Sequence, residues 1–143
     1  ARHFSGRGPF DRNSTLWSSW AIISEIGKIY FSGDSGYGKH FKKIGQDYGP
    51  FNIAMLDCGQ YNDAWKYSHM VPEEAVQASK DLNAMQFMPI HWGAFTLSTH
   101  DWADPVKRAI RSAKKNQLDI LTPEIGKIVT LGQKSEIDWW KKY

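Results

Sequence analysis

Residues 29–38 are Ile-Tyr-Phe-Ser-Gly-Asp-Ser-Gly-Tyr-Gly, an apolar run of strand length that opens into a loop rich in glycine and serine. Two further segments have a similar form, Ala-Arg-His-Phe-Ser-Gly-Arg at 1–7 and Met-Pro-Ile-His-Trp-Gly at 88–93. The residues that close the three predicted strands are His3, Asp34 and His91. Imidazole nitrogens and carboxylate oxygens hold Zn²⁺ and similar ions, and ligands on strand-end loops can converge. The sequence therefore predicts a metal site.

Composition indicates one folded domain. The chain has 143 residues, of which 41% are hydrophobic and 14% aromatic, enough for a buried core. Its net charge of +3 is only mildly basic, since 18 Lys and Arg are set against 15 Asp and Glu. We therefore expect no nucleic-acid partner.

Cysteine content limits the kind of metal site and the compartment. Cys58 is the single cysteine, which excludes an intrachain disulfide and a Cys-rich zinc site. We expect it to pack as a small apolar side chain rather than to act as a nucleophile. No apolar run approaches the roughly 20 residues that cross a bilayer. A reducing, cytoplasmic location is predicted.

Strands and helices are predicted to alternate, which is typical of an α/β layer structure. A first strand at 15–24 should form a hairpin with a strand at 28–31. Further strands are predicted at 51–56, 86–90, near 120 and at 128–131, and helices at 39–48, at 72–83 and from 104 onward. The helix from Asp104 has an amphipathic stripe, with Asp104 as its cap. The aromatic tail at 138–143 suits either packing or a partner surface.

Each candidate ligand also has a structural explanation. A lone histidine near a strand end is more often a hydrogen-bonded structural residue than a ligand, and the Asp of a Gly-Asp-Ser-Gly turn usually caps its own backbone. His40, in a charged helix start, and His100, in a polar loop, are expected to be solvated.

Several segments together resemble the metallo-β-lactamase-fold hydrolases. They are most similar to the branch of N-acyl-phosphatidylethanolamine-hydrolysing phospholipase D and its bacterial relatives. Besides the three segments above, the matching stretches are Leu-Trp-Ser-Ser-Trp, Ile-Gly-Gln-Asp-Tyr-Gly-Pro-Phe and His-Met-Val-Pro-Glu-Glu-Ala-Val-Gln. They extend in order from residue 1 to about residue 97, and the last third matches only in general pattern.

The resemblance implies a two-metal hydrolytic site. His3 would be a ligand of the first metal, Asp34 the carboxylate that bridges both metals, and His91 a ligand of the second metal. Zinc is the expected ion, and Mn²⁺ or Fe²⁺ is also compatible with these donors. Two ions about 3.5 to 4 Å apart can hold a hydroxide that attacks a phosphoryl or carbonyl centre.

One part of the family pattern is missing from the sequence. The family has a His-x-His-x-Asp-His motif upstream of the first match, and these 143 residues contain none. We therefore interpret residues 1–143 as the C-terminal half of an αββα sandwich, in which two αβ halves pack sheet on sheet. Alone, this half would expose its inner sheet face and be catalytically incomplete. The expected partners are the missing N-terminal half or a second copy of the chain.

Three more residues are candidates for substrate contact. His69 precedes the Pro-Glu-Glu helix in a motif shared with the phospholipase-like branch. It would orient the substrate or polarise its phosphoryl oxygen, or else simply bond to backbone at the helix entry. Gln60 and Tyr61 follow the strand at 51–56 and would line the same pocket, although the loop is about two residues shorter than in the family.

The resemblance thus implies a metal-dependent hydrolase, a phosphodiesterase of the phospholipase D-like branch when complete. Its substrate would be a phosphodiester or a phospholipid-like small molecule. A sugar-phosphate lactonase of a related branch is the enzymatic alternative. A non-catalytic module whose exposed sheet binds a partner is the alternative from another class.

Overall fold

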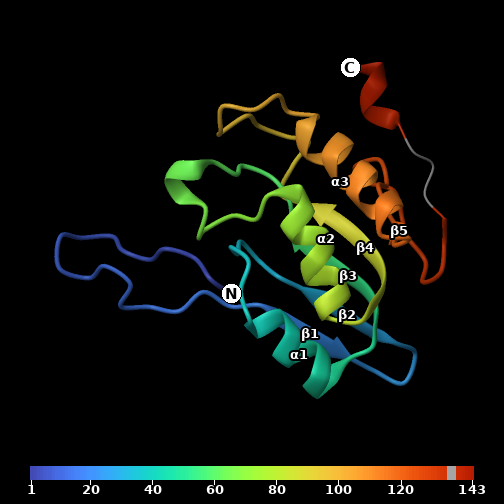
Figure 1. Ribbon diagram of the computed structural model, residues 1–143, viewed down its shortest axis with the longest axis horizontal. Coiled ribbons are helices and arrows are strands. Elements are labelled where there is room, and N and C mark those ends of the chain that lie inside the picture. The colour runs from blue at the N-terminus through green and yellow to red at the C-terminus, as the bar shows by residue number, and fades with distance from the viewer. Residues whose placement is uncertain (135–137) are drawn as a thin grey trace.

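A computed structural model describes residues 1–134 and 138–143 (Figure 1). A mixed five-stranded sheet in the order β1-β2-β3-β4-β5 is its centre. The strands are β1 (Trp20–Ile23), β2 (Lys28–Phe31), β3 (Phe51–Asp57), β4 (Ala84–Ile90) and β5 (Asp119–Ile120). The first two strands form an antiparallel hairpin, and β2, β3, β4 and β5 run parallel. The α/β class and the hairpin are therefore confirmed.

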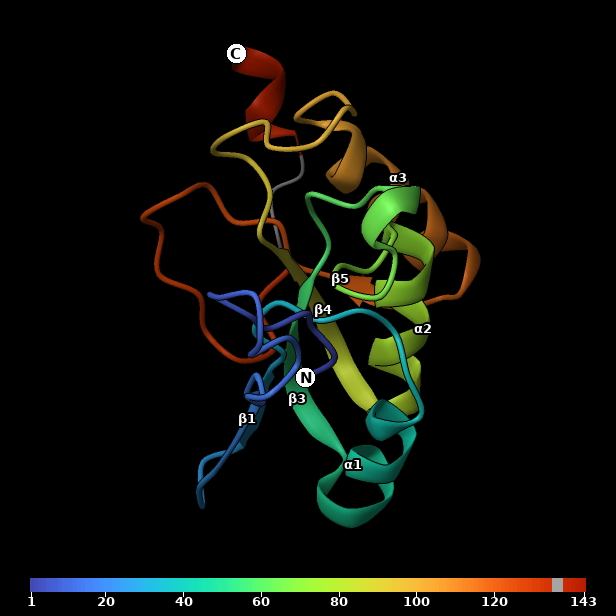
Figure 2. The ribbon, with the colours of Figure 1, turned by 90° about the vertical axis from the view of Figure 1, so that its left-hand side faces the viewer.

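Three helices cover one face of the sheet, as the side view in Figure 2 shows. They are α1 (His40–Tyr48), α2 (Pro72–Asp81) and α3 (Asp104–Lys115), and each connects two parallel strands. Proline in the first turn of α2 and α3 favours these starts because its fixed φ suits a helix and it lacks a donor that would go unpaired there.

The core lies between this sheet face and the helices. A row of facing residues crosses the sheet from Tyr30 through Ala54 and Phe87 to Ile120. Phe41 of α1 and Val76 of α2 are fully or almost fully buried against this row. Because side chains alternate along a strand, the same register sends the intervening residues to the opposite face.

That opposite face is apolar and only partly covered. Trp20, Phe31, Met55 and Met88 form one row across it. Trp20 is 63% exposed and the other three are half-buried. The loop at 121–134, which follows β5, runs on this side of the sheet, away from the helices (Figure 2). The face that the sequence predicts to be exposed is thus open along the hairpin.

Some element boundaries differ from those predicted. The predicted strand at 128–131 is wrong, because these described residues have no ladder partner. Instead the Gln86 side chain bonds the backbone of Gly132 and Gln133. The first strand is shorter than predicted, and α3 begins at Asp104 itself, so Asp104 is not its cap.

The C-terminal aromatic residues pack beside α3. Trp140 is 3% exposed and lies in a cluster with Ala103 and Val106, and Trp92 packs against it. Tyr143 remains 82% exposed. Of the two alternatives for the tail, packing therefore applies to Trp140. Within the described parts of the chain, no helix is both long enough and apolar enough to cross a membrane.

Candidate metal centre

Three parallel strands end at one edge of the sheet, and each brings an ionisable side chain there. Asp34 lies in the loop after β2, Asp57 is the last residue of β3, and His91 directly follows β4. The carboxyl ends of neighbouring parallel strands form a common edge, which is where α/β proteins usually place ligands. The sheet therefore gathers two carboxylates and one imidazole.

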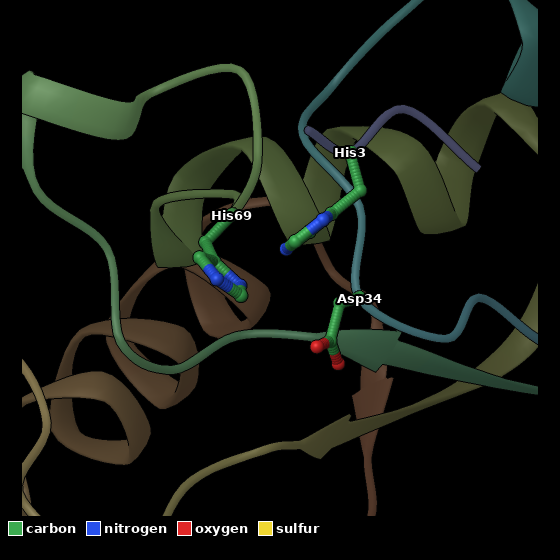
Figure 3. Close-up of side chains that lie close together, drawn as sticks. All are labelled: His3, Asp34 and His69. Atoms are coloured by element: carbon green, nitrogen blue, oxygen red, sulfur yellow. The ribbon is translucent and has the colours of Figure 1, made fainter. Parts of the chain in front are cut away.

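Two further histidines reach this edge from loops. The N-terminal segment is held beside the loop after β2, because Arg2 N donates to Ser35 Oγ at 2.9 Å and Gly36 N donates to Arg2 O at 2.7 Å. Phe4 N also donates to Ser68 Oγ, next to His69. As a result the side chains of His3, Asp34 and His69 are close together (Figure 3).

Backbone segments approach one another closely around the site. A Cβ at Gly36 would overlap the Tyr67 carbonyl, and a Cβ at Gly59 would overlap the carbonyl of His91. His91 itself has φ +66°, a left-handed conformation that usually costs a non-glycine residue about 1 to 2 kcal/mol. The backbone of His91 thus turns away from β4 at the point where it packs against Gly59.

The donor atoms form two overlapping groups. Those of His3, Asp34 and His69 lie within 4.8 Å of one another, and so do those of Asp57, His69 and His91. His91 Nε2 lies 3.9 Å from Asp34 Oδ1, which connects the groups. Half-buried imidazoles and a carboxylate are a donor set that suits Zn²⁺ and related divalent ions. The residues present fit such an ion.

Asp57 differs from the other members because it is completely buried. Asp57 Oδ2 lies 2.8 Å from His69 Nδ1, and the same oxygen accepts a hydrogen bond from Ser35 N at 3.0 Å. Burial raises the pKa of Asp57, although the bonds from His69 and Ser35 oppose this effect. Burial alone would lower the pKa of His69, but the bond to Asp57 and its charge outweigh burial and raise it.

The structure brings the predicted ligands together, but in a different grouping. His3 and Asp34 share one group, whereas His91 joins the second group, and His69 belongs to both. Sequence reasoning missed Asp57. Its signal was present, since an aspartate closes the apolar run of β3 just as a histidine follows β4.

Gln60 and Tyr61 are engaged in loop contacts. The Gln60 amide bonds the backbone of Phe95, Leu97 and Ser98. The Tyr61 hydroxyl donates to Asp104. Gln60 nevertheless borders a small cavity that His91 also lines. Their substrate-binding role stays a prediction, and the geometry gives them a part in shaping the loop beside the site.

Two predictions about other histidines are wrong. His40 is half-buried rather than solvated, and its Nε2 has no hydrogen-bond partner among the described residues. Burial lowers the pKa of His40 to about 4. His100 stacks on Tyr61 with ring centroids 4.2 Å apart. Cys58 is buried as predicted, and burial raises the pKa of its thiol well above the usual value.

Comparison with known proteins gives matches over most of the chain. A protein of Mycobacterium tuberculosis strain H37Rv, described as uncharacterized, is 43% identical over 145 aligned residues, covering 99% of this chain and 39% of that protein. Outer membrane protein RomA of Klebsiella pneumoniae is 54% identical over 93 residues, covering 65% of this chain and 70% of the relative.

An N-acyl-phosphatidylethanolamine-hydrolyzing phospholipase D of Caenorhabditis elegans is 41% identical over 105 residues, covering 71% of this chain and 30% of that protein. The chain thus spans about two fifths of the mycobacterial relative and less than a third of the nematode one.

A solved structure with the same fold is the metallo hydrolase Igni18 from Ignicoccus hospitalis. It superposes with a TM-score of 0.59 at 24% identity, covering 80% of this chain and 45% of that one. The family described as "Beta-lactamase superfamily domain" matches residues 1–92, which include the strands and loops that carry all five residues of the site. The chain therefore belongs to the β-lactamase superfamily.

Proposed function

We propose that this chain carries part of the active site of a metal-dependent phosphodiesterase of the phospholipase D-like branch. The observation that carries the proposal is the convergence of His3, Asp34, His69 and His91 at one sheet edge. In the proposal His3, Asp34 and His91 hold two divalent ions, most suitably zinc, with Asp34 shared between them. The sequence similarity to a relative named phospholipase D supports the choice of reaction.

The bound ions would supply a hydroxide at neutral pH and would stabilise charge on the attacked phosphoryl group. The protein's own contribution is orientation of the donors. His3 Nδ1 lies 2.7 Å from Phe4 O, so Nδ1 donates to this carbonyl and Nε2 is left for an ion. Asp34 is half-buried, with its carboxylate open toward His91.

A cavity of about 800 Å³ beside the cluster supports an anionic substrate with apolar parts. His3 and His69 line it together with Phe4, Trp65 and the cation Arg12. A guanidinium suits a phosphate group, and aromatic rings suit an apolar substituent. We infer that a phosphodiester enters from this side and reaches the histidines.

The remaining ligands would come from a further half of the protein. The chain spans only about two fifths of its mycobacterial relative. We propose that the partly covered face with Trp20, Phe31 and Met55 packs against an N-terminal half that carries the His-x-His-x-Asp-His motif.

A cytoplasmic location likewise stays a prediction. It rests on the single cysteine, and one relative is named an outer membrane protein.

The proposal is tested with the chain preceded by an N-terminal half of the superfamily that carries the motif. Metal content is measured by mass spectrometry, and turnover is measured with bis(p-nitrophenyl) phosphate before and after chelation. We expect about two ions and chelator-sensitive phosphodiester cleavage for the joined protein. We expect less metal and no turnover for the 143-residue chain alone, because too few ligands remain.

A matched lactone assay separates the enzymatic alternatives. Cleavage of a sugar-phosphate lactone without cleavage of the phosphodiester would contradict the proposed reaction. A metal-free, inactive joined protein would contradict the metal site itself. If the 143-residue chain also forms a stable dimer by light scattering, the binding-module alternative explains the open sheet face instead.

A further inference from the structure

Asp57 and His69 form a buried pair beside the metal centre. The carboxylate is completely buried, and the His69 side chain is only 13% exposed. Their connection, between Asp57 Oδ2 and His69 Nδ1, is 2.8 Å long. Such a short contact between a buried carboxylate and an imidazole fixes both the position of the ring and the nitrogen that carries hydrogen.

The surroundings of Asp57 decide the direction of this bond. Ser35 N donates to Oδ2 at 3.0 Å, and Gly59 N lies 3.4 Å from Oδ1. Both oxygens therefore already act as acceptors from the backbone, which favours the carboxylate form. A carboxylate can only accept, so the hydrogen in the contact belongs to His69 Nδ1.

This leaves Nε2 as the ring nitrogen available to the centre. The donor atoms of His3, Asp34 and His69 lie within 4.8 Å of one another. The His69 ring also lies 5.1 Å from the rings of both His3 and His91. In a neutral ring whose Nδ1 carries the hydrogen, Nε2 has a lone pair and cannot donate. The structure therefore disfavours a neutral His69 that donates a hydrogen bond to a phosphoryl oxygen.

We propose that Asp57 is a positioning residue that holds His69 as the Nδ1–H tautomer, so that Nε2 presents an electron pair to the metal centre. His69 would then accept a proton there or bind a divalent ion directly. Histidine ligands of metals commonly donate their second nitrogen to a carboxylate, and this partner orients the ring. The inference deepens the proposed function, but the tautomer is measurable without turnover.

The first test is long-range ¹H–¹⁵N correlation spectroscopy of the ¹⁵N-labelled chain at a pH where His69 is neutral. We expect a pyrrole-like shift for Nδ1 and a pyridine-like shift for Nε2, with assignment by loss of the signals in His69→Gln. A pyrrole-like Nε2 would overturn the proposal. This measurement needs no substitution of Asp57, so it remains decisive if such variants fail to fold.

The second test removes the charge of Asp57 and keeps its shape. Asp57→Asn retains an oxygen that accepts from Ser35 N, so the structural bond can survive. Because the same Oδ2 position also accepts from His69 Nδ1, the neutral amide oxygen should hold the hydrogen on Nδ1 more weakly than the carboxylate does, and we expect the Nδ1 and Nε2 shifts of His69 to move toward each other. Asp81→Asn is the matched control, because Asp81 also binds a side chain, the Tyr37 hydroxyl, but lies away from the centre. It should leave the His69 shifts unchanged.

An Asp57→Asn protein with a native backbone spectrum and unchanged His69 shifts would show that the charge of Asp57 does not hold the tautomer, and would overturn the positioning role proposed for the carboxylate. Adding Zn²⁺ alone then separates this inference from the proposed function. A wild-type chain with the expected tautomer but no zinc-dependent shift at Nε2 would leave the positioning role intact and contradict direct zinc binding by His69. A change in the chemical shift of His69 Nε2 on zinc addition supports both the positioning role of Asp57 and direct zinc binding by His69.

Discussion

Aspartates follow or end the neighbouring strands β2 and β3, and the two differ in burial and in hydrogen bonding. Asp34 lies in an open loop with its side chain 34% exposed, and its Oδ1 lies 3.9 Å from His91 Nε2. Asp57 is fully buried and accepts hydrogen bonds from backbone and from His69. An open carboxylate can take up an ion, whereas a buried and fully bonded one can only orient its neighbours.

The difference follows from the loops after the two strands. After β2 the chain passes through Gly33 and Ser35 before α1, which leaves Asp34 at the surface of the site. After β3 the chain turns at once through Gly59, whose backbone lies against His91 and whose N lies 3.4 Å from Asp57 Oδ1. We therefore expect two positions that look alike in sequence to act differently, Asp34 as the proposed metal ligand and Asp57 as the proposed positioning residue.

The largest expected effect comes from removing the open carboxylate. In the protein joined to its N-terminal half, Asp34→Ala should lower metal-dependent turnover by more than about 100-fold, beyond the 10- to 100-fold typical of an outer-shell partner. Its free energy of unfolding without metal should change by no more than about 0.5 kcal/mol, because the side chain is partly solvated. Steady-state kinetics and urea denaturation check the two parts.

Asp47→Ala is the control for this substitution, since Asp47 pairs with Lys43 on the exposed side of α1. It should retain wild-type turnover. An Asp34→Ala protein that keeps most of its activity would show that this carboxylate does not bridge metals.

Removing the buried carboxylate of Asp57 should, unlike Asp34→Ala, destabilise the fold itself. Asp57→Ala leaves Ser35 N and His69 Nδ1 without their acceptor in a buried place. We expect a loss of about 2 to 4 kcal/mol in the free energy of unfolding. Urea denaturation of the chain measures it. A variant as stable as Asp34→Ala would mean that burial does not distinguish the two aspartates.

An effect on acid stability is expected from His40, at the start of the helix that follows the Asp34 loop. Burial lowers its pKa to about 4 from the usual 6.5. Between these values the unfolded chain binds a proton that the folded chain does not, so stability falls as the pH decreases through this interval. His40→Gln should lose stability less steeply from pH 6.5 to pH 4.

Thermal unfolding at several pH values tests this prediction, with His100→Gln as the control because His100 lies in the loop between β4 and α3 and not in α1. Parallel pH profiles for His40→Gln and the wild type would show that another group controls acid unfolding.

The fold was predictable where local patterns decide it. Alternation and turn residues located β2 at 28–31, and Pro72 located the start of α2. The strand predicted at 128–131 is wrong because these residues pair with no strand of the sheet, and the Gln86 side chain holds the following turn instead. Such a contact joins residues far apart in sequence, so no local pattern indicates it.

The site was predictable only in part for the same reason. Strand-end position and the family resemblance indicated His3, Asp34 and His91. The bond between Asp57 and His69, twelve residues apart, depends on the path of the loop between them. The half-burial of His40 likewise results from tertiary packing at the start of α1, which a charged local sequence conceals.

The smallest expected effect concerns Cys58, the residue after Asp57. Its thiol is buried, with Sγ 3.9 Å from Pro105 O, and its raised pKa keeps it protonated and unreactive. Cys58→Ser should cost about 1 to 2 kcal/mol in the free energy of unfolding, because a hydroxyl is more costly to bury than a thiol. Turnover of the joined protein should stay within about twofold of the wild type, a change of under about 0.5 kcal/mol in the barrier. Kinetics and denaturation on the same preparation check both values, and a folded but inactive variant would assign chemistry to the thiol. Retained activity would show that Cys58 has no chemical role, although it directly follows Asp57 in the sequence. The chemistry would then belong to the side chains at the open edge of the sheet.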